Sequence, residues 1–215
     1  EVGGKKLPSV TTILRVLNKP ALNQWLVQKA IRTSVESALA NDGMGRDDLI
    51  AIASSEMGRK EEAERGSRAH EVAARCAQSI ATEEDRKNPY YPAIVDWFDT
   101  MKGEPLRVET LVYDLGLGYA GTVDLVARVR DGETWLVDWK TSKAVYPEHS
   151  LQLAAYAHCL KSDPLVGRVD DLAVVLLRPD GTHETALFGP RKDELFRLFL
   201  AAFDLWKYLR EGKDG

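Results

Sequence analysis

Two ionisable side chains, Asp138 and Lys140, stand two positions apart at the end of an apolar segment that begins at Thr134. Alternate residues of an extended strand point to the same face, so this carboxylate and ammonium share a patch, while Val137 and Trp139 point the other way. Such a pair can help to hold a metal ion and act on water or phosphate. A surface ion pair at a strand end has the same spacing, so the pair alone leaves both interpretations open.

A second carboxylate, Asp124, interrupts the apolar segment of residues 120–129. A charge in such a strand is costly unless a partner or a metal ion compensates it. Asp131 and Gly132 predict a two-residue turn into the next strand, so Asp124 and Asp138 can be neighbours. Two adjacent carboxylates repel each other, and a divalent cation between them makes both ionised forms favourable. Oxygen ligands of this kind select Mg²⁺ or Mn²⁺, which can activate water for attack on a phosphodiester.

Two hydrogen-bonding side chains, Gln152 and Tyr156, occur in the apolar segment that follows. Their apolar neighbours favour a helix over residues 150–160. Residues four apart lie on one face of a helix, so both polar groups point toward one place. Taken alone, this pair is a modest indication of a functional site.

Turn residues and hydrophobic periodicity predict the elements that would position these side chains. The predicted helices are residues 10–14 capped by Ser9, residues 21–40, residues 48 to about 80, residues 150–160, and a C-terminal amphipathic helix with apolar positions from Leu195 to Leu209. The predicted strands are residues 108–113, 120–129, 134–139, 172–177 and 182–188, and the first three form a meander. The fold class is therefore α/β (α+β), with a helical region over residues 1–104 and a sheet core with a C-terminal helix over residues 105–215.

Composition and charge narrow the class of protein. The 215 residues, 44% hydrophobic and 29% charged, suit one compact soluble domain. No apolar run approaches the roughly 20 residues of a membrane-spanning helix, so we expect an intracellular protein with no membrane partner. The net charge of −4 argues against a broad basic surface for nucleic acid. Arginines do gather near His70, but glutamates are interleaved with them, which is equally typical of a solvated, salt-bridged helix.

Four short motifs occur in a characteristic order: GSRAH ending at His70, GTVD ending at Asp124, DWKTS from Asp138 to Ser142, and QLAAY from Gln152 to Tyr156. In this combination the chain resembles the RecB-like and Cas4-like branch of the PD-(D/E)xK nuclease superfamily. The opening segment of residues 7–14, the DWKTS string and the terminal helix resemble in particular the mitochondrial genome maintenance exonuclease and its phage or bacterial relatives. The resemblance spans nearly the whole chain.

This resemblance implies a single domain over residues 1–215 with a restriction-endonuclease-like core, a central mixed sheet flanked by helices. The helical region of residues 1–104 would arch over a DNA channel. The resemblance assigns Asp124, Asp138, Lys140 and Glu109 to catalysis, His70, Asp124 and Asp138 to metal binding, and Gln152, Tyr156, Arg68 and Ser142 to DNA binding. The expected cofactor is one or two ions of Mg²⁺ or Mn²⁺.

The activity implied by the resemblance is that of a metal-dependent DNA exonuclease that prefers single strands or DNA ends, in repair, recombination or replication. A structure-selective endonuclease and a catalytically silent DNA-binding or recombination-mediator module are the alternatives. Cas4-like relatives hold an iron–sulfur cluster with four cysteines; Cys76 and Cys159 are too few, so no cluster is expected. The sequence carries no helicase signature, so a helicase or recombination protein would be a separate partner. We expect a cytoplasmic protein encoded by a bacterium or a phage.

Overall fold

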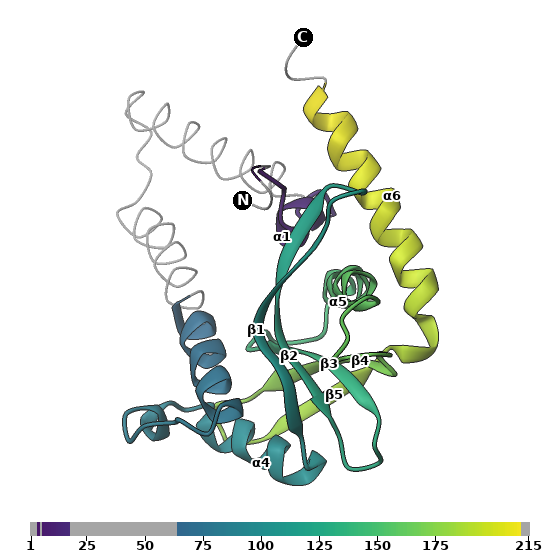
Figure 1. The fold of residues 1–215 in the computed structure, drawn as a ribbon. Helices are drawn as coiled ribbons and strands as arrows, with labels where there is room; N and C mark the ends of the chain where they lie inside the picture. The colour runs from purple at the N-terminus through teal and green to yellow at the C-terminus, as the bar shows by residue number, and fades with distance from the viewer. Residues whose placement is uncertain (1–3, 5, 18–63, 212–215) are drawn as a thin grey trace, which may run out of the picture. The chain divides into compact units, whose positions relative to one another are not determined.

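The computed structural model describes Gly4, residues 6–17 and residues 64–211 (Figure 1). Residues 1–17 and 66–215 form one compact unit, and residues 18–65 are grouped as a second. The predicted helix at residues 21–40 and the first part of the helix predicted from residue 48 lie outside the described residues. The single domain over residues 1–215, with an arch over a DNA channel, stays a prediction.

The described residues contain a mixed sheet of five strands in the order β1-β2-β3-β4-β5. The strands are β1 (Glu104–Asp114), β2 (Tyr119–Arg128), β3 (Thr134–Lys140), β4 (Asp171–Leu177) and β5 (His183–Leu187). Neighbouring strands pair antiparallel except β3 and β4, which are parallel. A parallel pair needs a crossover connection, and α5 (Pro147–Leu160) supplies it. The predicted meander and the predicted mixed sheet are confirmed.

Helices cover both faces of this sheet. The described helical segments are α1 (Val10–Leu14), residues 64–77, α4 (Tyr91–Met101), α5 and α6 (Lys192–Glu211). On one face α5 packs against the strands and α6 packs against α5, with α1 beside both (Figure 1). Residues 64–77 and α4 bury their apolar side chains against the other face. None of the helices in the described part of the chain is long and apolar enough to cross a membrane.

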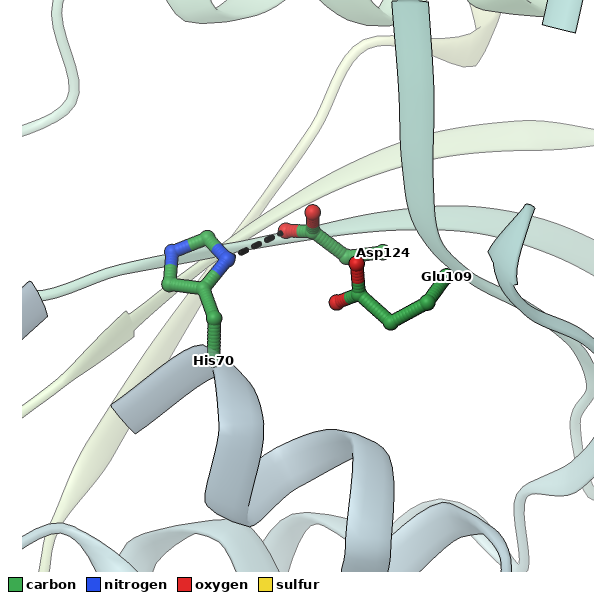
Figure 2. A group of neighbouring side chains, drawn as sticks. All are labelled: His70, Glu109 and Asp124. Carbon is green, nitrogen blue, oxygen red and sulfur yellow. Dashed lines mark ion pairs between the residues drawn. The ribbon is translucent and has the colours of Figure 1, made fainter. Parts of the chain in front are cut away.

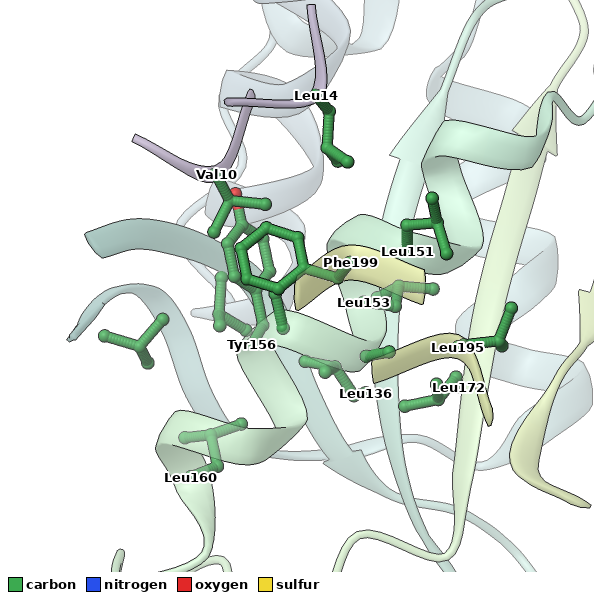
Figure 3. Close-up of a cluster of buried hydrophobic side chains, with 14 of the residues drawn as sticks. Val10, Leu14, Leu136, Leu151, Leu153, Tyr156, Leu160, Leu172, Leu195 and Phe199 are labelled. Carbon is green, nitrogen blue, oxygen red and sulfur yellow. The ribbon is translucent and has the colours of Figure 1, made fainter. Parts of the chain in front are cut away.

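The alternation of side chains along β3 divides the core into two clusters. Leu136 joins the cluster formed with α1, α5 and α6, which also contains Tyr156 and Phe199 (Figure 3). Val137 and Trp139 join the opposite cluster, where the ring of Trp139 meets that of Trp97 edge-on at 5.0 Å. Because both faces of the strand are buried, a shift of one residue would exchange side chains between the two clusters and turn the charge of Asp138 toward Trp97, so the register is strongly specified.

A glycine brings β2 unusually close to α5. A Cβ atom added to Gly121 would lie 2.3 Å from Cε1 of Tyr156, so the ring packs directly on the glycine backbone. No residue with a side chain fits there without displacement of the ring. Gly121, the first residue of the GTVD motif, therefore contacts Tyr156, the last residue of the QLAAY motif.

Several element boundaries differ from the sequence predictions. β1 begins at Glu104 instead of residue 108, and α5 begins at Pro147 instead of residue 150, because proline suits the first turn of a helix. The helix predicted to about residue 80 ends at residue 77, and Ser79 adopts a left-handed φ of 57°. A separate helix, α4, then follows.

One predicted turn is also corrected. The N–H of Val129 donates to the carbonyl of Glu133 at 2.8 Å, so residues 130–132 form the loop between β2 and β3 instead of a two-residue turn. By contrast, Ser9 caps α1 as predicted, since its side chain accepts a hydrogen bond from the N–H of Thr12.

Candidate metal centre

Three potential metal ligands, His70, Glu109 and Asp124, point toward one another from a helix and two strands (Figure 2). One ligand atom from each lies within 4.8 Å of those of the other two. His70 comes from the helical segment of residues 64–77, Glu109 from β1 and Asp124 from β2. Nδ1 of His70 lies 3.2 Å from Oδ2 of Asp124. We call these three residues the outer group.

Strand pairing places Glu109 beside Asp124. The pairs Val108↔Leu125 and Thr110↔Val123 flank the two acids, so these lie opposite each other in the register. Glu109 has a φ of 44°, in the left-handed region that residues other than glycine rarely adopt. Its carboxylate points toward His70 and Asp124 (Figure 2). Backbone conformations of this kind are costly and often occur at functional sites.

Asp124 lies where the ladder between β2 and β3 stops. The last recorded pair on this side is Leu125↔Val137. Beyond it, Oδ2 of Asp124 accepts a hydrogen bond from the backbone N–H of Trp139 at 2.9 Å. The side chain thus takes over a donor that a paired strand would otherwise satisfy, and it joins β2 to the part of β3 that carries Asp138 and Lys140.

Four further side chains form a buried network next to the outer group. Asp138 is 2% exposed, and its Oδ2 lies 2.5 Å from Nζ of Lys140. Nε2 of Gln152 donates to Oδ1 of Asp138 at 2.9 Å and to the hydroxyl of Tyr156 at 3.3 Å. We call Asp138, Lys140, Gln152 and Tyr156 the inner group.

Burial and mutual charge set the protonation of the outer group. Burial disfavours the charged form of His70, but its contact with Asp124 outweighs this and raises the pKa of the imidazole. Burial likewise opposes ionisation of Asp124, yet His70, Lys140 and the N–H of Trp139 together lower the pKa of this carboxyl. For Glu109, burial and the nearby charge of Asp124 raise the pKa. Two carboxylates and an imidazole therefore compete for protons in a small space.

In the inner group, burial dominates. Burial raises the pKa of Asp138, and Asp124 adds to this effect against the opposing influence of Lys140. Burial also raises the pKa of Tyr156, whose hydroxyl lies near both aspartates. The phenol therefore stays neutral and can serve only as a hydrogen-bonding group. The ammonium of Lys140 is the direct ionic partner of Asp138.

The donor set fits a divalent cation. Two carboxylates and one imidazole offer oxygen and nitrogen ligands, and a cation removes the repulsion between the acids. The two carboxylates suit Mg²⁺ or Mn²⁺, which favour oxygen ligands, and the imidazole adds one nitrogen ligand. A hollow of about 540 Å³, lined by His70, Glu109 and residues of the same helix, opens beside these ligands. Substrate can therefore approach the outer group from this side.

The structure brings most of the predicted site residues together. Glu109, expected to be catalytic, joins His70 and Asp124 as a potential ligand, while the oxygens of Asp138 contact Lys140 and Gln152. Metal binding by Asp138 stays a prediction. The sequence analysis did not place Glu109 among the metal ligands. The strand register could have shown this, because the turn after Asp114 places residue 109 opposite residue 124.

The four predicted DNA-binding residues have different environments. Arg68 is exposed on the helical segment that carries His70. The hydroxyl of Ser142 donates to the carbonyl of Ala144 at 2.8 Å and shapes the loop after β3. Gln152 and Tyr156 are only 8% and 4% exposed and face Asp138. DNA contact by these residues stays a prediction.

Comparison with known proteins gives one family. The family model described as the PD-(D/E)XK nuclease superfamily matches residues 25–212, which is well over half of the chain. No curated protein matches the sequence.

Proposed function

The chain belongs to the PD-(D/E)XK nuclease superfamily, and from that premise we propose that it is a metal-dependent DNA exonuclease. Members of this superfamily are nucleases that use divalent metal ions. The more specific part of the proposal is a preference for single-stranded DNA or DNA ends, in repair, recombination or replication. The observation that carries the proposal is the outer group, with its three potential ligands, directly beside the pair of Asp138 and Lys140.

Each half of the site has its own role in this proposal. His70, Glu109 and Asp124 would hold one Mg²⁺ or Mn²⁺ ion, with Asp138 as a further ligand. When bound, such an ion lowers the pKa of a coordinated water and stabilises charge on a phosphodiester. The outer group would fix the position of the cation because its ligands come from three separate elements.

Lys140 supplies the positive charge that belongs to the chain itself. Its ammonium is held at 2.5 Å from Asp138, which in turn is held by Gln152. An ammonium in this position can orient the attacking water or neutralise a phosphate oxygen. Because Asp138 and Gln152 are buried, their contacts would hold the ammonium in one direction.

The preference for single strands has its own two supports. It comes from the resemblance to the mitochondrial exonuclease branch and from the net charge of −4, since a broad basic face would suit long duplexes better. Stacking of unpaired bases on aromatic side chains would give affinity without sequence specificity.

End-labelled single- and double-stranded DNA, digested in Mg²⁺, Mn²⁺ or EDTA, tests the proposal directly. We expect cutting with either metal, none in EDTA, and a higher initial rate on the single strand than on the same strand in a blunt duplex. Equal or faster cutting of the duplex would contradict the strand preference and leave the metal site standing.

A circular single strand separates the remaining alternatives. An exonuclease leaves the circle intact while it degrades the linear form of the same sequence, and a structure-selective endonuclease cuts both. A silent DNA-binding module retards the linear strand in a gel but cuts neither form at any metal concentration.

A further inference from the structure

A second hollow, separate from the candidate metal centre, lies beyond the end of β3. It is a groove of about 690 Å³ between the loop of residues 143–147, the start of α5, β5 and the start of α6. Its floor is apolar and includes the buried side chains of Leu151, Leu176 and Leu195. A groove of this volume can hold a group the size of a nucleobase.

The walls of the groove combine aromatic and basic side chains. Tyr146 is 43% exposed at its edge, and Phe188 lines it from the other side. Three basic residues, Lys143, Arg178 and Arg191, line the groove together with a single acid, Glu184. This combination of an apolar slot and a basic rim suits an aromatic, anionic ligand.

The three basic residues are not equally available. Arg178 donates to the carbonyls of Ser142 and Lys143 at 3.1 and 3.2 Å, and Arg191 forms a two-pronged ion pair with Glu194. Lys143 has no acidic partner within ion-pair distance among the residues that the structure describes, and its side chain is exposed. Lys143 is therefore the cation of the rim that is free to bind a phosphate.

The groove is continuous along the chain with β3, the strand that carries Asp138 and Lys140. Lys143 follows Lys140 by only three residues, and the loop between them is held by the hydrogen bonds from Arg178. The N–H of Tyr146 donates to Nδ1 of His149 at 3.2 Å, and the two rings meet edge-on at 5.5 Å. Tyr146 is thus held in place at the start of α5. This continuity along the chain favours an occupant that also extends to Lys140.

We propose that this groove binds an unpaired nucleotide of the DNA strand that is being cut, with its base on Tyr146 and a neighbouring phosphate at Lys143. The proposal rests on the proposed function and names a substrate subsite for it. An acidic, apolar peptide of a partner protein would also fit the chemistry of the groove. The continuity with Lys140 favours the nucleotide.

The test measures binding of a fluorescein-labelled single-stranded oligothymidylate by anisotropy in EDTA, where the strand is not cut. Loss of one stacked base in Tyr146→Ala should raise the dissociation constant about 5- to 100-fold, and Tyr146→Phe should recover most of the affinity because the ring remains. Lys143→Gln should reduce the slope of log affinity against log salt by about 0.7.

Tyr208→Ala is the matched control, since Tyr208 is an exposed tyrosine of α6 that does not line the groove. Its affinity should equal that of the wild type. Thermal melting shows whether Tyr146→Ala still folds. An independent measurement needs no variant: an oligonucleotide with 4-thiothymidine is photo-crosslinked to the wild-type protein, and mass spectrometry should find adducts in residues 143–147.

The outcomes separate this proposal from the proposed function. Two results would overturn the nucleotide subsite alone, in a wild-type protein that binds and cuts the strand. In the first, Tyr146→Ala binds the strand as tightly as the wild type; in the second, the adducts lie only outside the groove. A peptide-binding groove predicts both results. A wild-type protein that neither binds nor cuts DNA with any metal overturns both.

Discussion

The outer and inner groups of the candidate site are built from similar residues but in different environments. In the outer group, the side chains of His70 and Asp124 are 29% and 10% exposed, and His70 and Glu109 line an open hollow. In the inner group, Asp138 is 2% exposed and accepts a hydrogen bond from Gln152, which also donates to Tyr156. The outer group can therefore exchange ligands with solvent, whereas Asp138, Gln152 and Tyr156 are closed off from it.

Because of this difference, we expect Asp124 on β2 and Asp138 on β3 to have different roles. Asp124, on the open side, has its pKa lowered by His70 and Lys140 despite burial, so it stays ionised and ready for a cation. Burial raises the pKa of Asp138, so its charge depends on Lys140. Substitutions in the outer group should weaken metal binding. Substitutions of Lys140, Gln152 or Tyr156 in the inner group should misplace groups while the metal still binds.

The largest effect is expected from Asp124→Asn. The change removes a metal ligand at constant volume, so kcat should fall about 100-fold or more, and binding of Mn²⁺ measured by calorimetry should weaken. Asp204→Asn is the matched control, because Asp204 is an exposed acid of α6 whose ion-pair partner is Lys207. Wild-type activity in Asp124→Asn would remove the outer group from the catalytic site.

Gln152→Met tests the inner group. Loss of the hydrogen bond to Asp138 should lower kcat about 10- to 100-fold, with the KM for DNA and the affinity for metal nearly unchanged. Gln78→Met, at an exposed position, should have no effect. If KM rises and kcat stays the same, Gln152 contacts DNA as the sequence motif predicts, and the comparison between the two groups fails.

Gly121→Ala tests the packing behind the inner group. The added Cβ would lie 2.3 Å from the ring of Tyr156, and the resulting displacement should lower the free energy of unfolding by about 1–3 kcal/mol. In the matched Gly66→Ala variant the Cβ would lie 3.4 Å from Oγ1 of Thr141, an ordinary contact. That variant should unfold at the wild-type temperature or slightly above it, because alanine is favoured in helices. Equal melting temperatures for the two variants would contradict the close packing.

The smallest effect concerns His149. Burial, followed by the charge of Lys140, lowers the pKa of this imidazole to about 4 and so keeps it neutral. Its pKa is thus lower in the folded chain than the 6.5 of the free side chain, so its contribution to stability is complete above pH 6.5 and is lost as the pH falls toward 4. Between pH 7 and pH 4.5, the wild type should lose about 2 kcal/mol more than His149→Gln, which keeps an acceptor for Tyr146 but does not titrate. Urea denaturation at both pH values measures this. An equal loss in both proteins would show that His149 is not held neutral.

Local rules were sufficient to predict one part of the site. The alternation of side chains in a strand placed Asp138 and Lys140 on one face, and helical periodicity placed Gln152 and Tyr156 together; both are confirmed. The position of Glu109 also follows from a local feature, the turn of residues 115–118, once the antiparallel register is counted back from it.

Other parts of the site depend on tertiary packing. Helical periodicity shows that Gln152 and Tyr156 share a face, but only the packing of α5 on the sheet shows that this face meets Asp138. Local propensity likewise does not predict the left-handed φ of Glu109, because glutamate rarely adopts this conformation. The groove beside Tyr146 has walls from β5 and α6. Because these elements are distant from Tyr146 along the chain, sequence analysis cannot predict the groove.

The parallel pairing of β3 with β4 has a consequence for the order in which the chain folds. β1 and β2 are joined by residues 115–118 only, so their hairpin closes a short loop and can form early. β3 also pairs with β2 through a short loop, but its end with Asp138 and Lys140 lies beyond that ladder and pairs with β4. Residues 141–170 separate β3 from β4, and such long-range pairing is slow. Glu109 and Asp124 therefore come together early in folding, and Asp138 and Lys140 reach their buried positions late. A partly folded chain would carry paired acids without the lysine that completes the site.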